Sequence, residues 1–135
     1  MPREPEPRLS GLRILIVEDM GLVAEELRWM VEEIGCRVVA VASRLERAKA
    51  LARSEDINGV LLDLNLSGEN SSPVAAILRE RKIPYIIISG YEASGRHQDG
   101  AAAAHLKKPF DDDELAAVML RAFGSGSSAA VLRGK

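Results

Sequence analysis

The strongest constraint on the fold is a repeated alternation between short apolar runs and segments with helical periodicity. The apolar runs lie at residues 12–17, 37–42, 59–62, 84–89 and 103–107. Short runs of this kind, bounded by polar or turn residues, are typical of buried parallel strands. Helical segments between parallel strands supply the crossover connections. We therefore expect an α/β fold in which helices cover both faces of a parallel sheet.

Four segments predict helices, and three of them carry recognisable N-terminal signals. The helical segments are residues 20–34, 43–53, 72–81 and a last segment that begins at residue 111. The pairs Ser43–Glu46 and Asp111–Glu114 have the spacing of a capping box. Ser72 has the position of an N-cap before Pro73. Residues 91–102 have little apolar periodicity, so we expect a short or irregular fourth helix there.

The composition of the ends predicts one folded domain with two extensions. The chain has 135 residues, which suits a single domain. Residues 1–10 are proline-rich and charged, so we expect a disordered leader rather than a secretory signal. Residues 124–135 resemble a flexible linker. The folded domain is therefore predicted at residues 11–123.

Charge and cysteine content exclude several classes of partner and compartment. The chain has 18 basic and 20 acidic residues and a net charge of −2, which gives no electrostatic footprint for nucleic acid or an anionic membrane. No apolar run approaches the roughly 18 residues of a membrane span. Cys36 is the only cysteine and cannot form an internal disulfide. We therefore expect a cytoplasmic protein.

Polar side chains stand where the predicted strands end. Glu18 and Asp19 follow the first strand, Asp63 follows the third, Ser89 ends the fourth, and Lys108 follows the fifth. In doubly wound sheets the carboxyl ends of the strands meet at one edge, where ligands bind. These five residues are therefore expected to converge.

The residue types suggest phosphoryl chemistry. Three carboxylates repel one another, and Mg²⁺, which prefers oxygen ligands, would relieve that repulsion. A carboxylate beside such a metal can act as a nucleophile on phosphorus, which makes Asp63 the candidate phosphoacceptor. Lys108 offers positive charge to the transferred group, and Ser89 offers a hydroxyl. Lys107 competes with Lys108, but the proline that follows favours Lys108.

These motifs resemble the receiver domain of two-component response regulators, over about residues 12–123. The matching segments are ILIVED (14–19), LLDLNL (61–66), IIISG (86–90) and LKKPF (106–110). The resemblance implies a flavodoxin-like sheet of five strands in the order 2-1-3-4-5. It also implies that Glu18, Asp19, Asp63 and the backbone carbonyl of Asn65 bind Mg²⁺, and that Asp63 accepts the phosphoryl group.

The same resemblance assigns roles around the phosphate. Ser89 would be the switch hydroxyl and Lys108 the phosphate-binding lysine, with a cis bond before Pro109. His105 stands at the switch position, where the family usually has Tyr or Phe. The 19 positions from Ser89 to Lys108 (108 − 89) are about three fewer than is common, which again predicts a shortened fourth helix.

A narrower resemblance is carried by DLNLSGENSSPVA (63–75) and IPYIIISGYEASG (83–95). Both segments are similar to stand-alone receivers of alphaproteobacterial stress signalling, in which the fourth strand runs into a Thr-Gly-Tyr-like motif. Here that motif is Ser89-Gly90-Tyr91.

The resulting hypothesis is a single-domain response regulator. It would accept phosphate from a sensor histidine kinase or a phosphotransfer protein, as a monomer or weak dimer, and would act by contact with a downstream protein or as a phosphate sink. Autodephosphorylation would be slow, so the chain is not expected to be an enzyme. Two alternatives are a small Mg²⁺-dependent phosphatase, which usually carries an Asp where Asn65 stands, and a degenerate receiver that binds partners without phosphorylation.

Trp29 lies opposite the apolar stripe of the first helix, among glutamates. A large aromatic side chain there either covers a neighbouring surface or contacts a partner. Trp29 and Tyr91 are therefore candidate partner-surface residues.

Overall fold

A five-stranded parallel sheet forms the centre of the computed structural model, which describes residues 6–90 and 101–124. Its strands are β1 (Arg13–Val17), β2 (Arg37–Ala42), β3 (Gly59–Asp63), β6 (Tyr85–Ser89) and β7 (Ala104–Lys107). They are arranged in the order β2-β1-β3-β6-β7. This arrangement confirms the predicted order 2-1-3-4-5 for the main sheet.

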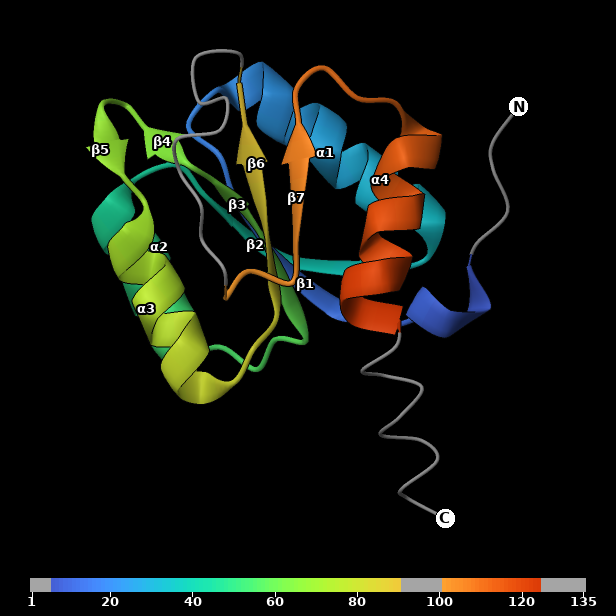
Figure 1. The fold of residues 1–135 in the computed structure, drawn as a ribbon, viewed down its shortest axis with the longest axis horizontal. Coiled ribbons are helices and arrows are strands. Elements are labelled where there is room, and N and C mark those ends of the chain that lie inside the picture. The colour runs from blue at the N-terminus through green and yellow to red at the C-terminus, as the bar shows by residue number, and fades with distance from the viewer. Residues whose placement is uncertain (1–5, 91–100, 125–135) are drawn as a thin grey trace.

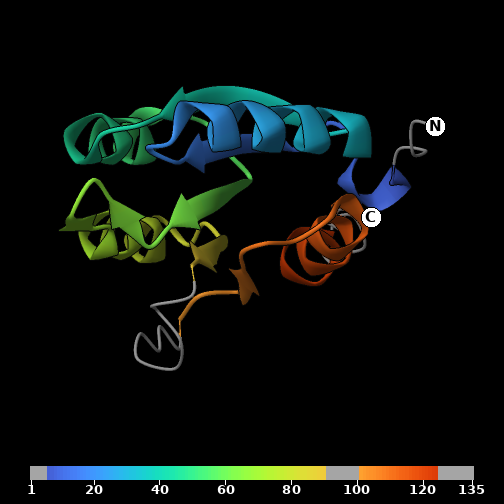
Figure 2. The ribbon, with the colours of Figure 1, turned by 90° about the horizontal axis from the view of Figure 1, so that it is seen from above.

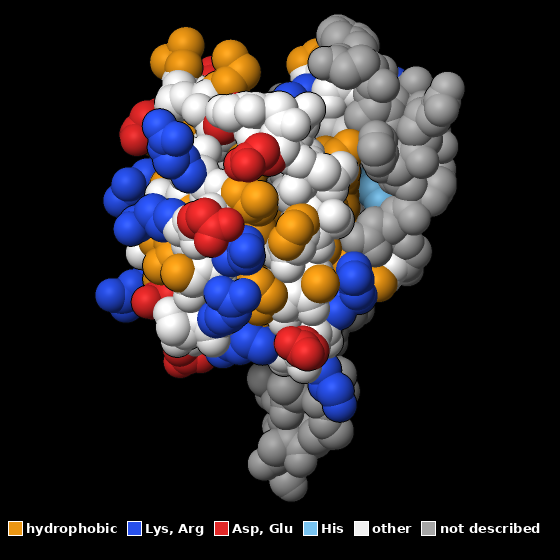
Figure 3. Space-filling model, turned by 90° about the vertical axis from the view of Figure 1, so that its left-hand side faces the viewer, with side chains coloured by type: hydrophobic (Ala, Val, Ile, Leu, Met, Phe, Trp, Pro, Cys, Tyr) orange, Lys and Arg blue, Asp and Glu red, His pale blue; other side chains and the backbone are white. Residues whose placement is uncertain are grey.

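Helices cover both faces of the sheet (Figure 1). Helices α1 (Gly21–Ile34) and α4 (Asp112–Met119) lie on one face, and α4 continues into a π-helical turn at Leu120–Gly124. Helices α2 (Leu45–Ser54) and α3 (Ser72–Arg81) lie on the other face. Figure 3 shows that outer side, where Lys and Arg side chains flank apolar ones. Seen from above, α2 and α3 lie at one end of the view and α4 at the other (Figure 2).

Alternate residues of each central strand supply two separate cores. In β1, Ile14 and Ile16 pack in the cluster that includes α1 and α4, whereas Leu15 and Val17 pack in the cluster that includes α2 and α3. Both faces of the central strands β1, β3 and β6 are thus buried, which explains why these strands appear in the sequence as continuous apolar runs. Burial on both sides fixes the strands and therefore the positions of the loops at their ends.

The predicted helix starts are partly right. The capping box of Asp111 and Glu114 is confirmed, with both reciprocal hydrogen bonds present. The capping box predicted at Ser43 and Glu46 is wrong: α2 begins after Arg44, which makes no side-chain cap, and Glu46 instead accepts a hydrogen bond from Lys49.

The N-cap predicted for α3 is also shifted by one residue. Ser71, not Ser72, precedes the helix, and Pro73 stays within its first two positions. The amide of Ser72 donates to the side-chain oxygen of Asn70 instead. Side-chain geometry in the preceding loop thus moves the start of the helix.

Part of the predicted leader is folded. Pro7–Leu9 form a 3₁₀ turn, and the side chain of Leu9 is fully buried between β1, α1 and the end of the last helix. The amide of Glu6 donates to the carbonyl of Ile34. An isolated leucine among prolines and charges gave no periodic signal, so the sequence pattern missed this contact. At the other end, Gly124 is buried rather than part of a tail.

The loop predicted after β3 contains a small hairpin. Strands β4 (Asn65–Leu66) and β5 (Glu69–Asn70) pair antiparallel around Ser67 and Gly68, both of which have positive φ (51° and 88°). Two consecutive residues with positive φ form the tight turn that two-residue hairpins favour, and glycine suits the second position. The hairpin lies at the carboxyl edge of the sheet.

The shortened helix predicted at residues 91–100 lies outside the described residues. Gly90 and residues 101–103, which flank that stretch, are not helical. Among the helices that the structure describes, none is both long and apolar enough to cross a lipid bilayer.

Gly59 provides a test of how the last helical turn packs on the sheet. A Cβ atom at Gly59 would lie 2.6–2.8 Å from three ring atoms of Phe123. Gly59→Ala should therefore lower the free energy of unfolding by about 1–3 kcal/mol, because the buried ring has to move. Urea denaturation measures this change. Gly21→Ala is the matched control, since nothing lies within 4 Å of its Cβ position, and it should leave stability unchanged or slightly higher.

Candidate functional site

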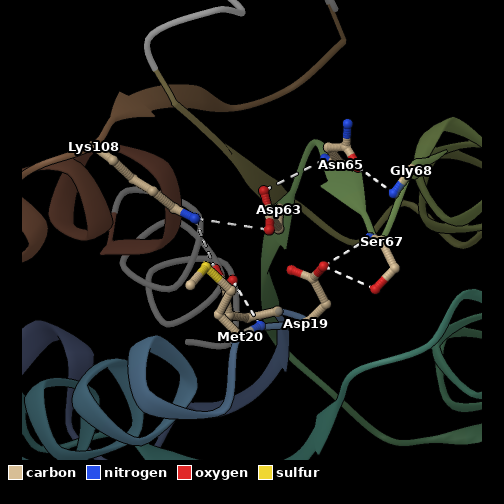
Figure 4. Close-up of polar contacts among 8 residues, drawn as sticks. Asp19, Met20, Asp63, Asn65, Ser67, Gly68 and Lys108 are labelled. Atoms are coloured by element: carbon tan, nitrogen blue, oxygen red, sulfur yellow. Dashed lines mark hydrogen bonds and ion pairs between the residues drawn. The ribbon is translucent and has the colours of Figure 1, made fainter.

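The ends of three strands bring four charged side chains together (Figure 4). Glu18 and Asp19 directly follow β1, Asp63 is the last residue of β3, and Lys108 directly follows β7. Backbone hydrogen bonds fix these ends: the amide of Glu18 donates to Ala42, and the amide of Lys108 donates to Ser89. The predicted convergence of these residues is thus observed in the structure.

Two of the three carboxylates are buried. Glu18 is 1% exposed and Asp63 is 6% exposed, whereas Asp19 is half-buried. Carboxylate oxygens of the three residues lie within 4.8 Å of one another. Burying two negative charges this close costs free energy unless a positive charge compensates them.

Lys108 supplies part of that compensation. Its Nζ atom lies 3.2 Å from Oε1 of Glu18 and 3.8 Å from Oδ2 of Asp63. Oε1 of Glu18 has no hydrogen-bond partner of good geometry within the described chain, so the ammonium group is its main electrostatic partner. The other oxygen of Glu18 accepts from the amide of Met20 at 3.2 Å.

The pKa of Asp63 reflects this imbalance. Burial of the carboxyl, together with the negative charge of Glu18, raises its pKa from 3.8 to about 7. The charge of Lys108 and the hydrogen bond from the amide of Asn65, at 3.4 Å, oppose the shift without cancelling it. At neutral pH a substantial fraction of the Asp63 carboxyl groups is thus protonated, and additional positive charge nearby would lower that fraction.

Asp19 is held by hydrogen bonds from Ser67, whereas Glu18 and Asp63 lie beside the ammonium group of Lys108. Its Oδ2 atom accepts two hydrogen bonds from Ser67, one from the backbone amide at 2.7 Å and one from the hydroxyl at 3.0 Å. Partial burial alone would raise the pKa of Asp19, but these bonds outweigh it and lower the pKa below its usual value. Asp19 therefore stays ionised beside the buried pair.

The donor set fits a hard divalent cation. All three side chains offer oxygen, the ligand type that Mg²⁺ prefers, and these oxygens lie close enough together to share one ion. Oε1 of Glu18 is buried without a well-formed hydrogen bond, so a cation bound beside it would satisfy this acceptor. The cluster of Glu18, Asp19 and Asp63 could thus hold Mg²⁺.

The other residues predicted for the site lie around this cluster. Asn65 is exposed in the hairpin, where its side-chain oxygen accepts from the amide of Gly68 at 2.8 Å. Ser89 ends β6 beside Lys107 of β7. His105 is an exposed residue of β7. The bond between Lys108 and Pro109 is cis, the geometry that the resemblance implied.

Of the two candidate partner-surface residues, the structure describes one. Trp29 is 57% exposed on α1, in the outward position that the helical periodicity predicted. Met20 and Leu22, near the start of α1, are also exposed, at 57% and 80%. Tyr91 lies outside the described residues.

Sequence reasoning missed the role of Ser67. The dipeptide Ser67-Gly68 is a typical turn signal. Nothing local pairs it with Asp19, which lies 48 residues earlier in the chain. Only the folded structure brings the hairpin against the acidic cluster.

The sequence matches the response regulator receiver domain over residues 14–120, and the chain therefore belongs to that family. The transcriptional regulatory protein TcrA of Mycobacterium tuberculosis is 35% identical over an alignment of 113 residues, which covers 80% of this chain and 44% of TcrA.

Two solved structures show the same similarity. The response regulator PhyR from Brucella abortus superposes with a TM-score of 0.78 and 29% identity, over 93% of this chain and 53% of PhyR. SdrG from Sphingomonas melonis superposes with a TM-score of 0.72 and 31% identity, over 84% of this chain and 96% of SdrG. This chain thus spans about half the length of TcrA and PhyR but nearly all of SdrG. The receivers of alphaproteobacterial PhyR-like proteins are accordingly among its structural neighbours.

The raised pKa of Asp63 predicts a specific dependence of stability on pH. The folded state binds more protons at this carboxyl than the unfolded state between about pH 4 and pH 7. The free energy of unfolding should therefore fall as the pH rises through that window, by roughly 3–4 kcal/mol from this group in the absence of divalent cations. Asp63→Asn, which cannot ionise, should lose that part of the dependence.

Urea denaturation at pH 5 and pH 8 in the presence of EDTA measures the effect. The difference between the two pH values should be smaller in Asp63→Asn than in wild type. Glu46→Gln, at an exposed position on α2, is the control and should behave like wild type. An equal pH dependence in wild type and Asp63→Asn would contradict the account of the buried pair.

Proposed function

We propose that this receiver domain accepts a phosphoryl group on Asp63 from the phosphohistidine of a sensor histidine kinase or a phosphotransfer protein. The observation that carries the proposal is the position of the Asp63 carboxylate. It ends β3 at the open edge of the sheet, with two further carboxylates and the ammonium group of Lys108 around it.

In the proposed step the phosphoryl group passes from the imidazole nitrogen of a phosphohistidine to the carboxylate of Asp63. A carboxylate oxygen of Asp63 forms a bond to phosphorus while the bond between phosphorus and the imidazole nitrogen breaks, and the bonding electrons stay on the nitrogen. Lys108 can then exchange its contact with Asp63 for one with an oxygen of the phosphoryl group. The hydroxyl of Ser89, at the end of the adjacent strand, is the proposed hydrogen-bond donor to another of these oxygens.

Ionisation of Asp63 is the condition for this step. With a pKa near 7, a substantial share of the carboxyl groups is protonated and cannot attack phosphorus. Positive charge among the three carboxylates lowers that pKa, because it favours the ionised form. Mg²⁺, when bound by Glu18, Asp19, Asp63 and the carbonyl of Asn65, would supply this charge and also neutralise the phosphoryl oxygens.

Asn65 favours a phosphoacceptor over a phosphatase. A small phosphatase of this type needs an acid/base two residues after its nucleophile, and an amide cannot transfer protons in that role. The side chain of Asn65 is moreover engaged in the hairpin through the amide of Gly68. The phosphoryl group should thus be lost only slowly, and the domain is proposed to act as a signal carrier rather than an enzyme.

The surface beside the site suits docking of a phosphodonor. A groove of about 200 Å³ lies between α1 and the segment from Lys108 to Phe110, lined by apolar residues that include Val23 and Met30. Met20 and Leu22, at the start of α1, are two further exposed apolar side chains. Trp29 lies on the opposite side of α1 and is proposed as a separate contact for the donor or for a downstream protein.

Output is proposed to run through protein contact or through withdrawal of phosphate from a shared kinase. The segments that resemble stand-alone receivers of alphaproteobacterial stress signalling support a role of that type, and the similarity to SdrG covers 96% of that chain. Monomer or weak dimer is the proposed state. Cys36, a buried free thiol, is consistent with the proposed cytoplasmic location.

Incubation with acetyl phosphate, followed by intact mass measurement, tests the proposal. Wild type should gain the mass of one phosphoryl group in the presence of Mg²⁺ and none in EDTA. Asp63→Asn should gain none, because the amide is a poor nucleophile. Asp56→Asn, a change of the same chemistry at an exposed carboxylate that pairs with Arg13, is the matched control and should be phosphorylated like wild type. Phosphorylation of Asp63→Asn to the level of wild type would place the acceptor elsewhere.

A further inference from the structure

The hairpin of β4 and β5 contacts Asp19 of the acidic cluster through Ser67. Ser67, at the tip of the hairpin, donates two hydrogen bonds to the carboxylate of Asp19. Both bonds end on the same oxygen, Oδ2. Figure 4 shows the other oxygen of Asp19 on the side of Asp63. Asp19 is therefore held by one oxygen and presents the other to the cluster.

The conformation of the hairpin makes this contact specific. Ser67 has φ 51°, a value that few residues other than glycine adopt, and the next residue, Gly68, also has positive φ. The side-chain oxygen of Asn65 accepts from the amide of Gly68, and the amide of Ser71 donates to Leu64 at the base of the loop. These bonds hold Ser67 in place even though its surroundings are exposed.

The same hairpin also contains Asn65, whose carbonyl is the proposed fourth ligand. One short element would thus supply a ligand from its first strand and an orienting group from its turn. Carboxylate ligands of metal ions are commonly oriented by such outer hydrogen bonds, and loss of one typically weakens metal binding by roughly 10–100-fold.

We propose that Ser67 is a positioning residue for Mg²⁺ binding: its hydroxyl and amide fix the carboxylate of Asp19 so that the second oxygen is directed into the cluster of Glu18 and Asp63. This inference rests on the proposed function, because it concerns the same cation. It adds that affinity for the cation depends on the hairpin, which is 48 residues away from Asp19 in sequence. By linkage, bound Mg²⁺ in turn stabilises the hairpin.

Two substitutions separate the hydrogen bond from the backbone conformation. Ser67→Ala removes the hydroxyl and keeps the unfavourable positive φ. Ser67→Gly removes the same hydroxyl but relieves the positive φ, so this variant should be the more stable of the two. Both variants keep the backbone amide. Calorimetric titration with Mg²⁺ should give a dissociation constant roughly tenfold higher than wild type for both variants, the lower end of the expected range because one of the two bonds remains.

Ser72→Ala is the matched control in the same loop. Ser72 is exposed, and only its backbone amide takes part in the bonds that shape the loop. Its affinity for Mg²⁺ should equal that of wild type. Urea denaturation of all four proteins in EDTA supplies their stabilities independently of the cation.

The outcomes distinguish the alternatives. Equal weakening in both Ser67 variants, despite their different stabilities, supports the positioning role. Unchanged binding overturns it, and so does tighter binding, which would mean that Ser67 competes with the cation for Asp19. The proposal is also overturned if only the less stable variant, Ser67→Ala, loses affinity for Mg²⁺ while Ser67→Gly binds like wild type. Stability of the hairpin, and not the hydroxyl, would then determine the affinity. Absence of Mg²⁺ binding by wild type would instead contradict the proposed function itself.

Discussion

The repulsion between the buried carboxylates of Glu18 and Asp63 is the interaction on which the site depends. Lys108 lies within 4 Å of both, but one ammonium group faces two carboxylates, with a third at Asp19 close by. The result is a site with an excess of negative charge and a carboxyl whose pKa is raised to about 7. A positive charge that enters such a site lowers its electrostatic free energy. The proposed binding of Mg²⁺ would relieve this imbalance, and it would also offset the further negative charge that a phosphoryl group on Asp63 would bring.

The sheet supplies the stability that makes this arrangement tolerable. β1 and β3 are paired side by side and buried on both faces, with apolar clusters above and below. Because the strands cannot move apart, Glu18 and Asp63 cannot relieve their repulsion by separating. Perturbed ionisable groups at the edge of a rigid scaffold are characteristic of functional sites. Here the parallel order of the strands also brings in Lys108 from β7, two strands away from β3.

The sequence was informative wherever the structure depends on local patterns. Continuous apolar runs predicted the strands, the family resemblance implied their order, and the spacing of Asp111 and Glu114 predicted a capping box that is present. The capping box predicted from the same spacing at Ser43 and Glu46 is wrong, because Glu46 pairs with Lys49 and the helix starts two residues after Ser43. A capping pattern specifies which bonds can form, not which competing partner is nearer.

Contacts between segments that are distant in the chain could not be predicted from the sequence pattern. The burial of Leu9 depends on Ile34 and the last helical turn, and the contact between Ser67 and Asp19 depends on a hairpin that follows another strand. The ligand types of the site could be predicted, because carboxylates at strand ends converge in any doubly wound sheet. Their orientation could not, because it is set by hydrogen bonds from a loop with no periodic signal.

The most direct measurement is the free energy of unfolding at pH 8 as a function of Mg²⁺ concentration. If the three carboxylates hold the cation, wild type should gain stability steadily once the concentration exceeds the dissociation constant, by about 1.4 kcal/mol for each further factor of ten. Asp19→Asn, which removes a proposed charged ligand, should need more Mg²⁺ for the same gain than wild type or either Ser67 variant, whereas Glu25→Gln, on the exposed face of α1, should follow wild type. A wild type whose stability does not respond to Mg²⁺, or an Asp19→Asn curve identical to it, would contradict the account.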